Sequence, residues 1–346
     1  MHKSAGRAGP RTVGGYSEPV QRRVPAVLRR RGVVIGLQVA FLVAFTAVLG
    51  WFLRDTWRDA LPLLRHADLG DIGIALGVMS GYYLMFVLGW QWILGGLGIR
   101  IGYPLALQAE MASMLAKYVP GTVWTPIARI LWLRRAGGVT ETSVVFGSIA
   151  LEAGLSAVSG VLVFAIGLAV IGESSETLIP LTTFAVLVLV LLHPRVFVPL
   201  SRKAFARLGW PPFPVLTYRA MLGLLAFYSV SWLVGGVAVL YLARSLGADP
   251  GWSSVPYLGG TAAVGAIVTV LSVFAPSGLG VREGSTYGLL LAVVSAPVAL
   301  GVTVLNRLAI TIVEALLLAL GVGLWWAARG SRTEARAADP APAERA

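Results

Sequence analysis

Long apolar runs separated by short polar stretches dominate the sequence. A helix needs about 20 predominantly apolar residues to cross the hydrocarbon core of a bilayer. The runs long enough for a full span are 33–53, 71–95, 140–172, 178–196, 220–243 and 300–328. Because only helices and closed barrels satisfy their backbone groups inside lipid, these runs predict an all-α polytopic membrane protein with about six full spans.

Two further apolar regions, 104–135 and 256–298, do not fit a single uninterrupted helix. Each is broken near its middle by proline and glycine, namely Pro120 and Gly121 in the first region and Pro276, Gly278 and Gly280 in the second. Irregular backbone is tolerated at membrane depth only where it is buried in protein or lines a cavity. Both regions are therefore predicted to be re-entrant helical hairpins, which brings the total to eight apolar segments. Two full spans in place of each hairpin remain an alternative, because they leave the parity of the topology unchanged.

The distribution of charge orients this topology. Eight basic residues and one acidic residue precede the first span. The positive-inside rule then puts the N-terminus in the cytoplasm. The same topology puts Arg134, Arg135 and the basic segment 195–219 inside, and it puts 54–70 and the base-free segment 172–176 outside. We therefore expect a multi-pass protein of the plasma membrane with both termini cytoplasmic.

Polar composition at the two ends predicts disorder there. A basic N-terminal segment, 1–32, and an Ala/Pro/Arg/Glu-rich tail, 329–346, both lack the apolar residues that would support a packed core. The transmembrane domain is thus predicted to cover 33–328.

The two interrupted regions occupy matching positions in the chain. Pro120 precedes Glu152 by 32 residues, and Pro276 precedes Arg307 by 31 residues. In the expected topology the first hairpin enters from the cytoplasm and the second from outside. This pattern predicts an inverted-topology repeat with halves at about 71–172 and 220–328, the plan of many secondary transporters, which bind their substrate at the repeat interface.

Ionisable side chains within the apolar segments are the main candidates for function, because an Arg or Asp at the bilayer centre costs about 2.5–3.5 kcal/mol on insertion scales. Glu110, Ser113 and Lys117 share one helix face before the first interruption. The other polar residues within or beside apolar segments are Arg129, Glu152, Arg282, Glu283, Asn306, Arg307 and Glu314.

Two interpretations of these residues remain open. They could hold helices together, with Glu152 paired to Arg307 or Lys117 paired to Glu283, or reach the interface by snorkelling. Alternatively, they line a polar pathway. The pathway is favoured because both signs of charge gather beside the two breaks, and a free helix N-terminus attracts anions.

Composition supports a membrane protein and excludes several kinds of site. The 346 residues are 57% hydrophobic and 13% charged, whereas soluble domains carry roughly 25% charged residues. The net charge of +12 sits in clusters between apolar runs, so it indicates contact with headgroups rather than with nucleic acid. Arginine supplies 25 of the 28 basic residues, which indicates a GC-rich, bacterial source. No cysteine, histidine cluster or phosphate-binding loop is present, so no metal site and no cofactor are expected.

Two motifs resemble a known family. Residues 117–124, K-Y-V-P-G-T-V-W, followed by Arg129, resemble the K-Y-x-P-G-x-x-W…R segment of the lysylphosphatidylglycerol synthase transmembrane-region family. Residues 276–283, P-S-G-L-G-V-R-E, resemble its P-G-G-L-G-x-R-E segment, with Ser277 in place of the commoner glycine. Asn306 and Arg307 resemble a later S-R pair, with asparagine replacing serine. The resemblance covers roughly 33–328.

The resemblance implies a role in moving lipids. Full-length aminoacyl-phospholipid synthases join this membrane region to a large cytosolic catalytic domain, and the membrane region is associated with lipid translocation between leaflets. Here about eighteen residues follow the last predicted span, too few for an acyltransferase fold. We therefore expect no synthesis of lysylphosphatidylglycerol by this chain.

The predicted function is translocation of a charged phospholipid or a polyprenyl-linked lipid, with an anionic or aminoacylated headgroup, through a polar groove at the repeat interface. No catalytic residue is assigned. The residues predicted to line the groove are Lys117, Tyr118, Pro120, Gly121, Trp124, Arg129, Glu152, Pro276, Gly278, Gly280, Arg282, Glu283, Asn306, Arg307 and Glu314.

Two other functions are weighed. A polyprenyl-phosphate-dependent glycosyltransferase needs a carboxylate base near an external loop, and the candidates are Asp55, Asp59, Asp68 and Asp71. These aspartates alternate with arginines, as in an ordinary solvated loop. The remaining possibility is a non-catalytic membrane partner of a separate lipid-modifying enzyme.

Overall fold

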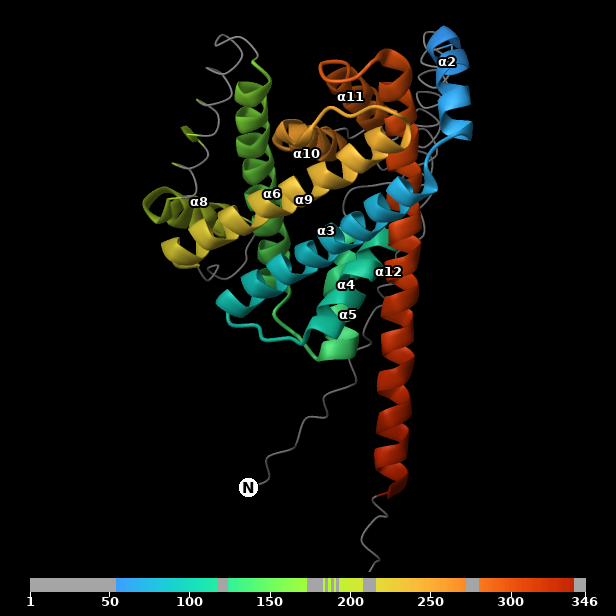
Figure 1. Ribbon diagram of the computed structural model, residues 1–346. Helices are drawn as coiled ribbons and strands as arrows, with labels where there is room; N and C mark the ends of the chain where they lie inside the picture. Colours follow the sequence, from blue (N-terminus) through green and yellow to red (C-terminus); the bar gives the residue numbers. More distant parts are fainter. Residues whose placement is uncertain are drawn as a thin grey trace, which may run out of the picture.

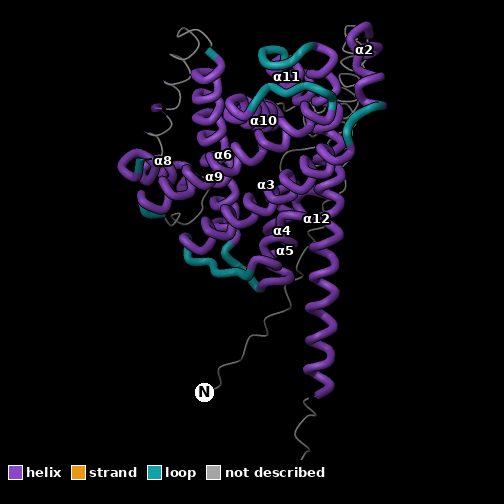
Figure 2. The backbone as a smooth tube through the Cα atoms, viewed as in Figure 1, coloured by secondary structure: helices purple, strands orange, loops and turns teal. Residues whose placement is uncertain are grey.

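The computed structural model describes residues 54–116, 124–172, 193–207, 216–271 and 280–338, together with isolated positions between 183 and 190 (Figure 1). Within these ranges all regular structure is helical, as Figure 2 shows. Several predicted features lie outside the described residues: the N-terminal segment and first span, most of the span at 178–196, and the prolines of both interruptions.

Long apolar helices form the frame of the molecule. Among the described residues, four are long and apolar enough to cross a membrane, and they are α3 (Leu69–Gly96), α6 (Thr142–Ile171), α9 (Tyr218–Ser245) and the Ala296–Trp326 part of α12. They match the runs at 71–95, 140–172, 220–243 and 300–328, so the prediction of a helical membrane protein is confirmed. In Figure 1, α3 and α12 run downward along the chain, whereas α6 and α9 run upward.

Two pairs of shorter helices lie where the interrupted regions were predicted. α4 (Tyr103–Ala116) packs on α5 (Trp124–Gly137), and α10 (Val255–Leu271) packs on α11 (Val281–Leu290). A helix of 14 residues is only about 21 Å long, too short for a hydrocarbon core of about 30 Å. The pair α4 and α5 lies in the lower half of Figure 1, and the pair α10 and α11 lies in the upper half.

We call the helices between 69 and 171 the first half of the chain and those between 218 and 326 the second half, and the two sets pack in an exchanged pattern, in which helices of one contact helices of the other. α3 lies against α9, while α6 packs on α10 and α12 packs on α4. Glycines allow the closest of these contacts, because a Cβ at Gly167 of α6 would collide with the backbone of Tyr257 in α10. A Cβ at Gly259 of α10 would likewise collide with the carbonyl oxygen of Trp232 in α9. Small residues at such positions let backbones approach in the membrane, where apolar side chains gain little by leaving lipid.

Two segments that the sequence predicted as loops are helical. α2 (Arg54–Arg65) occupies the predicted external loop and packs on α12, where its Ala60 contacts Leu300. α8 (Pro194–Arg207) occupies much of the predicted cytoplasmic loop, with Phe197 packed against an apolar cluster to which α3, α6 and α9 contribute. Each has enough apolar side chains to anchor one face, although neither forms a long apolar run.

α12 is also longer than predicted. The helix continues to Ala338, so the part of the expected unstructured tail up to that residue is helical. The added residues are mostly Ala, Arg and Glu, which favour helix. Extending an existing helix requires no new nucleus. An apolar run therefore marks the hydrocarbon-facing part of a helix rather than its end.

Candidate functional site

A buried arginine ties together three helices of the first half. Arg129 of α5 is only 6% exposed. Its Nη1 lies 2.5 Å from Glu152 Oε2 in α6, and its Nη2 forms an ion pair with Glu110 of α4. Its Nε donates to Ser113 Oγ at 3.3 Å. We call Glu110, Ser113, Arg129 and Glu152 the Arg129 cluster.

An aromatic ring from α3 completes the surroundings of this arginine. The guanidinium carbon of Arg129 lies 4.6 Å from the ring centroid of Trp90, which is fully buried. The indole of Trp90 donates in turn to Ser148 Oγ at 3.0 Å. Every side of the guanidinium thus faces a carboxylate, a hydroxyl or a π-face, the groups that stabilise a desolvated arginine. The cluster therefore stabilises the packing of α4, α5 and α6.

A second ion pair occurs in the other half and is looser. Glu283 Oε1 of α11 lies 3.4 Å from Arg307 Nη1 of α12, and the two side chains are 21% and 25% exposed. The other carboxylate oxygen of Glu283 accepts from the N–H of Gly280 at 2.6 Å and so caps α11. Gly280 has φ 83, a backbone angle that favours glycine. The motif glycine and glutamate therefore start α11 together.

The two ion pairs occupy corresponding positions, but the basic and acidic residues have exchanged places. Each joins the short helix that follows an interruption to the next long helix: Arg129 to Glu152 in the first half, and Glu283 to Arg307 in the second. The cross-pairing of Glu152 with Arg307 considered from the sequence is wrong, because each residue has a partner within its own half. Lys117, the other partner considered for Glu283, lies outside the described residues.

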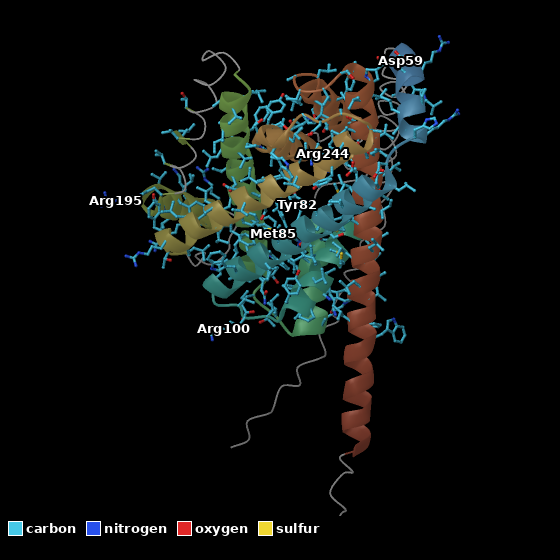
Figure 3. All side chains as sticks on the ribbon, in the orientation of Figure 1. Asp59, Tyr82, Met85, Arg100, Arg195 and Arg244 are labelled. Carbon is cyan, nitrogen blue, oxygen red and sulfur yellow. The ribbon has the colours of Figure 1, made fainter. Side chains whose placement is uncertain are left out.

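A cavity of about 190 Å³ lies between the two halves. Figure 3 labels Tyr82, on its wall, near the centre of the helical bundle. We call this space the central cavity. Aromatic residues and a few polar groups dominate its lining, chiefly Tyr82, Tyr83, Phe86, Trp232, Glu110, Arg282 and Asn306. Glu110 belongs to both sites, so the Arg129 cluster forms part of the cavity wall.

Arg282 is the basic residue of the cavity lining, and its surroundings differ from those of Arg129. Its side chain crosses Gly265 of α10, where an added Cβ would lie 3.4 Å from Arg282 Cγ. In the part of the chain that the structure describes, no ion pair joins Arg282 to a carboxylate. The cavity thus presents a guanidinium whose donors are available to an anion.

Glu314 lies behind the cavity wall and accepts a hydrogen bond from a lining residue. It is buried in α12, and its Oε1 accepts a hydrogen bond from the hydroxyl of Tyr83 at 3.2 Å. Tyr83 therefore links the cavity surface to a carboxylate of the last long helix. Tyr82 stands beside it, with the two rings edge to face at 5.4 Å.

The described residues divide the sequence-predicted groove into separate places. Arg282 and Asn306 line the central cavity, Arg129 and Glu152 are held in the buried cluster, and Trp124 is 39% exposed at the start of α5. The predicted residues outside the described part of the chain are Lys117, Tyr118, Pro120, Gly121, Pro276 and Gly278.

The aromatic wall was missed by sequence reasoning. Tyr82, Tyr83 and Trp232 lie within otherwise apolar spans, where large aromatic residues usually serve packing. The adjacent tyrosines in mid-span were the available signal, since each hydroxyl needs a polar partner inside a membrane.

The aspartates considered for an external base have another position. Asp68 is the N-cap of α3, and its Oδ1 accepts from the N–H of Asp71 at 2.8 Å. Asp59 is exposed on α2, at the upper right of Figure 3. A capping role accounts for Asp68 without catalysis.

Residues 33–321 match the family described as lysylphosphatidylglycerol synthase TM region. The chain belongs to this family. The matched range contains the Arg129 cluster, both sides of the central cavity and the Glu283–Arg307 pair, so the resemblance drawn from the two sequence motifs is confirmed. Membership indicates a membrane role connected with lipids. No curated protein matches the chain.

Proposed function

We propose that the protein translocates the charged headgroup of a lipid between leaflets through the central cavity. The observation that carries this proposal is Arg282, whose guanidinium lines a cavity near the middle of α3 and has no carboxylate partner among the described residues. A charge at membrane depth is expensive unless it is compensated. A phosphate group would supply the missing charge and accept several of the arginine's hydrogen bonds.

The size of the cavity favours a headgroup rather than a whole lipid. A volume of about 190 Å³ accommodates a phosphate with a small polar substituent, while the acyl or prenyl chains stay in the bilayer. The idealised cost of moving a bare ion into a medium of low dielectric constant is of order 20 kcal/mol. Arg282, Asn306 and the tyrosine hydroxyls would replace part of the lost water.

The exchanged packing of the helices supports an inverted-topology repeat whose two halves move relative to each other during transport. If 69–171 corresponds to 218–326, the α6–α10 contact corresponds to the α12–α4 contact, and α3 and α9 meet at the axis. The short pairs lie in opposite halves of Figure 1, as re-entrant hairpins entering from opposite sides would. Alternating access would then rock one half against the other around the central cavity.

The two ion pairs suggest unequal roles for the halves. The Arg129 cluster is buried, and two carboxylates share its arginine, so it would keep α4, α5 and α6 together during the cycle. The Glu283–Arg307 pair is longer and partly exposed. A phosphate that reaches Arg282 could compete with Glu283 for Arg307 and loosen α11 from α12.

Charge supports cytoplasmic termini. Arg100 is labelled at the base of the packed helices in Figure 3, the side on which α5 ends with Arg134 and Arg135 and toward which α12 runs before it continues further down. The positive-inside rule assigns such an end to the cytoplasm.

The test is reconstitution into liposomes that carry fluorescent lipids with anionic, zwitterionic or polyprenyl-phosphate headgroups. The rate at which an impermeant quencher gains access to the label measures translocation. We expect faster translocation than in protein-free liposomes for at least one phosphate-bearing lipid, and loss of that gain in Arg282→Gln. Arg135→Gln, which removes an exposed arginine at the end of α5, is the matched control and should retain the gain. Rates equal to those of protein-free liposomes for every lipid would overturn the proposal.

A further inference from the structure

A second hollow lies on the face of α3 opposite the central cavity. It measures about 470 Å³, and we call it the α3 groove; its lining is Leu88, Gln91, Trp92, Gly95, Ile99, Arg100, Ile101 and Phe227. Gln91 follows Tyr82 by nine residues, which at about 100° per residue places it half a turn away on the helix. The groove is therefore separate from the proposed translocation path.

The walls of the groove are apolar and open to the outside. Leu88 and Trp92 are each 46% exposed. The Trp92 ring is held against α9, since an added Cβ at Gly223 would lie 3.1 Å from its Cη2 atom. Its ring also meets that of Phe227 edge to face, with centroids 6.2 Å apart. A fixed indole and two further apolar side chains thus form a surface that suits a hydrocarbon chain.

The mouth of the groove is built by a fixed turn after α3. Gly98 has φ 92, and the N–H of Ile99 donates back to the carbonyl oxygen of Leu94 at 2.9 Å. The side-chain amide of Gln91 donates to the carbonyl oxygen of Ile101 at 2.8 Å and holds the following segment against the helix. These bonds place Arg100 at the rim by local structure, as a glycine-ended helix does.

Arg100 gives the mouth a positive charge. It is exposed, and it forms no ion pair with a carboxylate in the described ranges. α3 ends at Gly96, so Arg100 follows the end of a span, where headgroups are expected, while Leu88 lies about 12 Å back along the helix axis. Tryptophan and arginine at this level are typical of contact with the membrane interface.

We propose that the α3 groove binds one glycerophospholipid with an anionic headgroup from the leaflet at the lower end of the molecule. One acyl chain lies along Leu88, Trp92 and Phe227, and the phosphate faces Arg100. The apolar walls select a lipid over free phosphate, and the single cation at the mouth selects an anionic headgroup over a zwitterionic one. Because the groove and the central cavity occupy opposite faces of α3, this binding does not depend on translocation.

The test uses the full chain in detergent, titrated with phosphatidylglycerol or with phosphatidylcholine of the same acyl chains, and native mass spectrometry counts the retained lipids. We expect half-saturation by phosphatidylglycerol at a concentration roughly tenfold lower than by phosphatidylcholine. Arg100→Gln should abolish this preference, Arg100→Lys should keep most of it, and Trp92→Ala should weaken retention of both lipids.

Two controls separate the groove from other effects. Arg135→Gln, at the same end of the molecule, should keep the wild-type preference. Arg100→Gln combined with Arg282→Gln should lose more of the preference than Arg282→Gln alone, which removes only the cation of the central cavity. An unchanged preference in Arg100→Gln would overturn the proposal. An equal loss in Arg135→Gln would also overturn it, since the preference would then come from the general basic surface.

Discussion

Arg129 and Arg282 follow the two interruptions of the apolar pattern, yet their surroundings are opposite. Arg129 is paired with two carboxylates, a hydroxyl and an indole ring, whereas Arg282 lines a cavity without a carboxylate partner in the described part of the chain. The same residue type therefore serves stability where its charge is neutralised, and we propose that it serves headgroup recognition where its charge is left available. What distinguishes the two is the set of partners, which the position in the motif does not reveal.

The largest effect is expected from Arg129→Met. Removing the guanidinium leaves Glu110 and Glu152 buried together without compensation, and breaking a buried pair typically costs about 3–5 kcal/mol. The free energy of unfolding in detergent should fall by that order, with loss of folded protein during purification. Combining the change with Glu110→Gln and Glu152→Gln should restore part of the stability. If the single variant were as stable as the wild type, the cluster would not stabilise the packing of these helices.

Arg282→Gln should show the reverse pattern. Loss of an uncompensated charge from a cavity wall should not lower the free energy of unfolding, and it can raise it, because a charge at membrane depth is costly without a partner. Translocation should fall by more than roughly tenfold, because the phosphate would then cross without its counter-charge. Unfolding and transport measured on the same preparation check this. A stability loss comparable to that of the Arg129 variant would erase the contrast between the two arginines.

Glu283→Gln probes the looser ion pair. The pair with Arg307 is partly exposed, so its loss should cost about 1 kcal/mol or less, while the glutamine carbonyl can still accept from Gly280. Arg129→Gln removes the cation that Glu110 and Glu152 share in the buried cluster and should cost several times more. Parallel unfolding curves for the two variants test this ranking. Equal losses would show that the two ion-pair sites contribute equally to the free energy of unfolding.

Tyr83→Phe removes the hydrogen bond to Glu314. The expected stability loss is about 1 kcal/mol, with a moderate decrease in translocation because the cavity loses one polar group. Tyr82→Phe removes the other tyrosine hydroxyl of the same wall and serves as the comparison. A larger transport defect in Tyr82→Phe would show that the hydroxyl of Tyr82 contributes more to translocation than that of Tyr83.

The smallest effect is expected at the ion pair between Arg244, in the last turn of α9, and Asp249, in the segment that follows the helix. Arg244 Nε donates to Asp249 Oδ1 at 3.1 Å, and the N–H of Gly251 donates to the same oxygen. The Arg244 hydrogen bond and then the Gly251 N–H hold the pKa of Asp249 below its usual value of 3.8. A depressed pKa contributes stability that is present above the unfolded value and lost as the pH falls through the folded one. Asp249→Asn should therefore lower the free energy of unfolding slightly at neutral pH, and its difference from the wild type should disappear as the pH falls well below about 4; a difference that is larger at low pH than at neutral pH would contradict this.

The sequence predicted the long helices well because lipid demands uninterrupted apolar runs. α3, α6 and α9 begin and end within a few residues of the predicted spans. α2 and α8 were missed because they lie outside the apolar runs, and polar composition alone does not separate an interfacial helix from a loop. The polar tail that extends α12 was missed for the same reason.

The sequence predicted which residues belong to the candidate site, but it did not predict which of them contact one another. Arg129, Glu152, Glu283 and Arg307 were identified by the cost of charge in a membrane, but the pairing of Glu152 with Arg129 depends on how α5 packs against α6. No spacing rule supplies that contact across a helix break. Tyr83 was overlooked because its role depends on Glu314, a residue 231 positions away.

The most direct test of the central claim compares Arg282→Lys with Arg282→Gln in one series of liposomes carrying a labelled anionic lipid. If Arg282 supplies the counter-charge for a headgroup in transit, the lysine variant should keep a substantial part of the wild-type translocation rate and the glutamine variant should match protein-free liposomes. A glutamine variant that translocates as fast as the wild type would contradict the account.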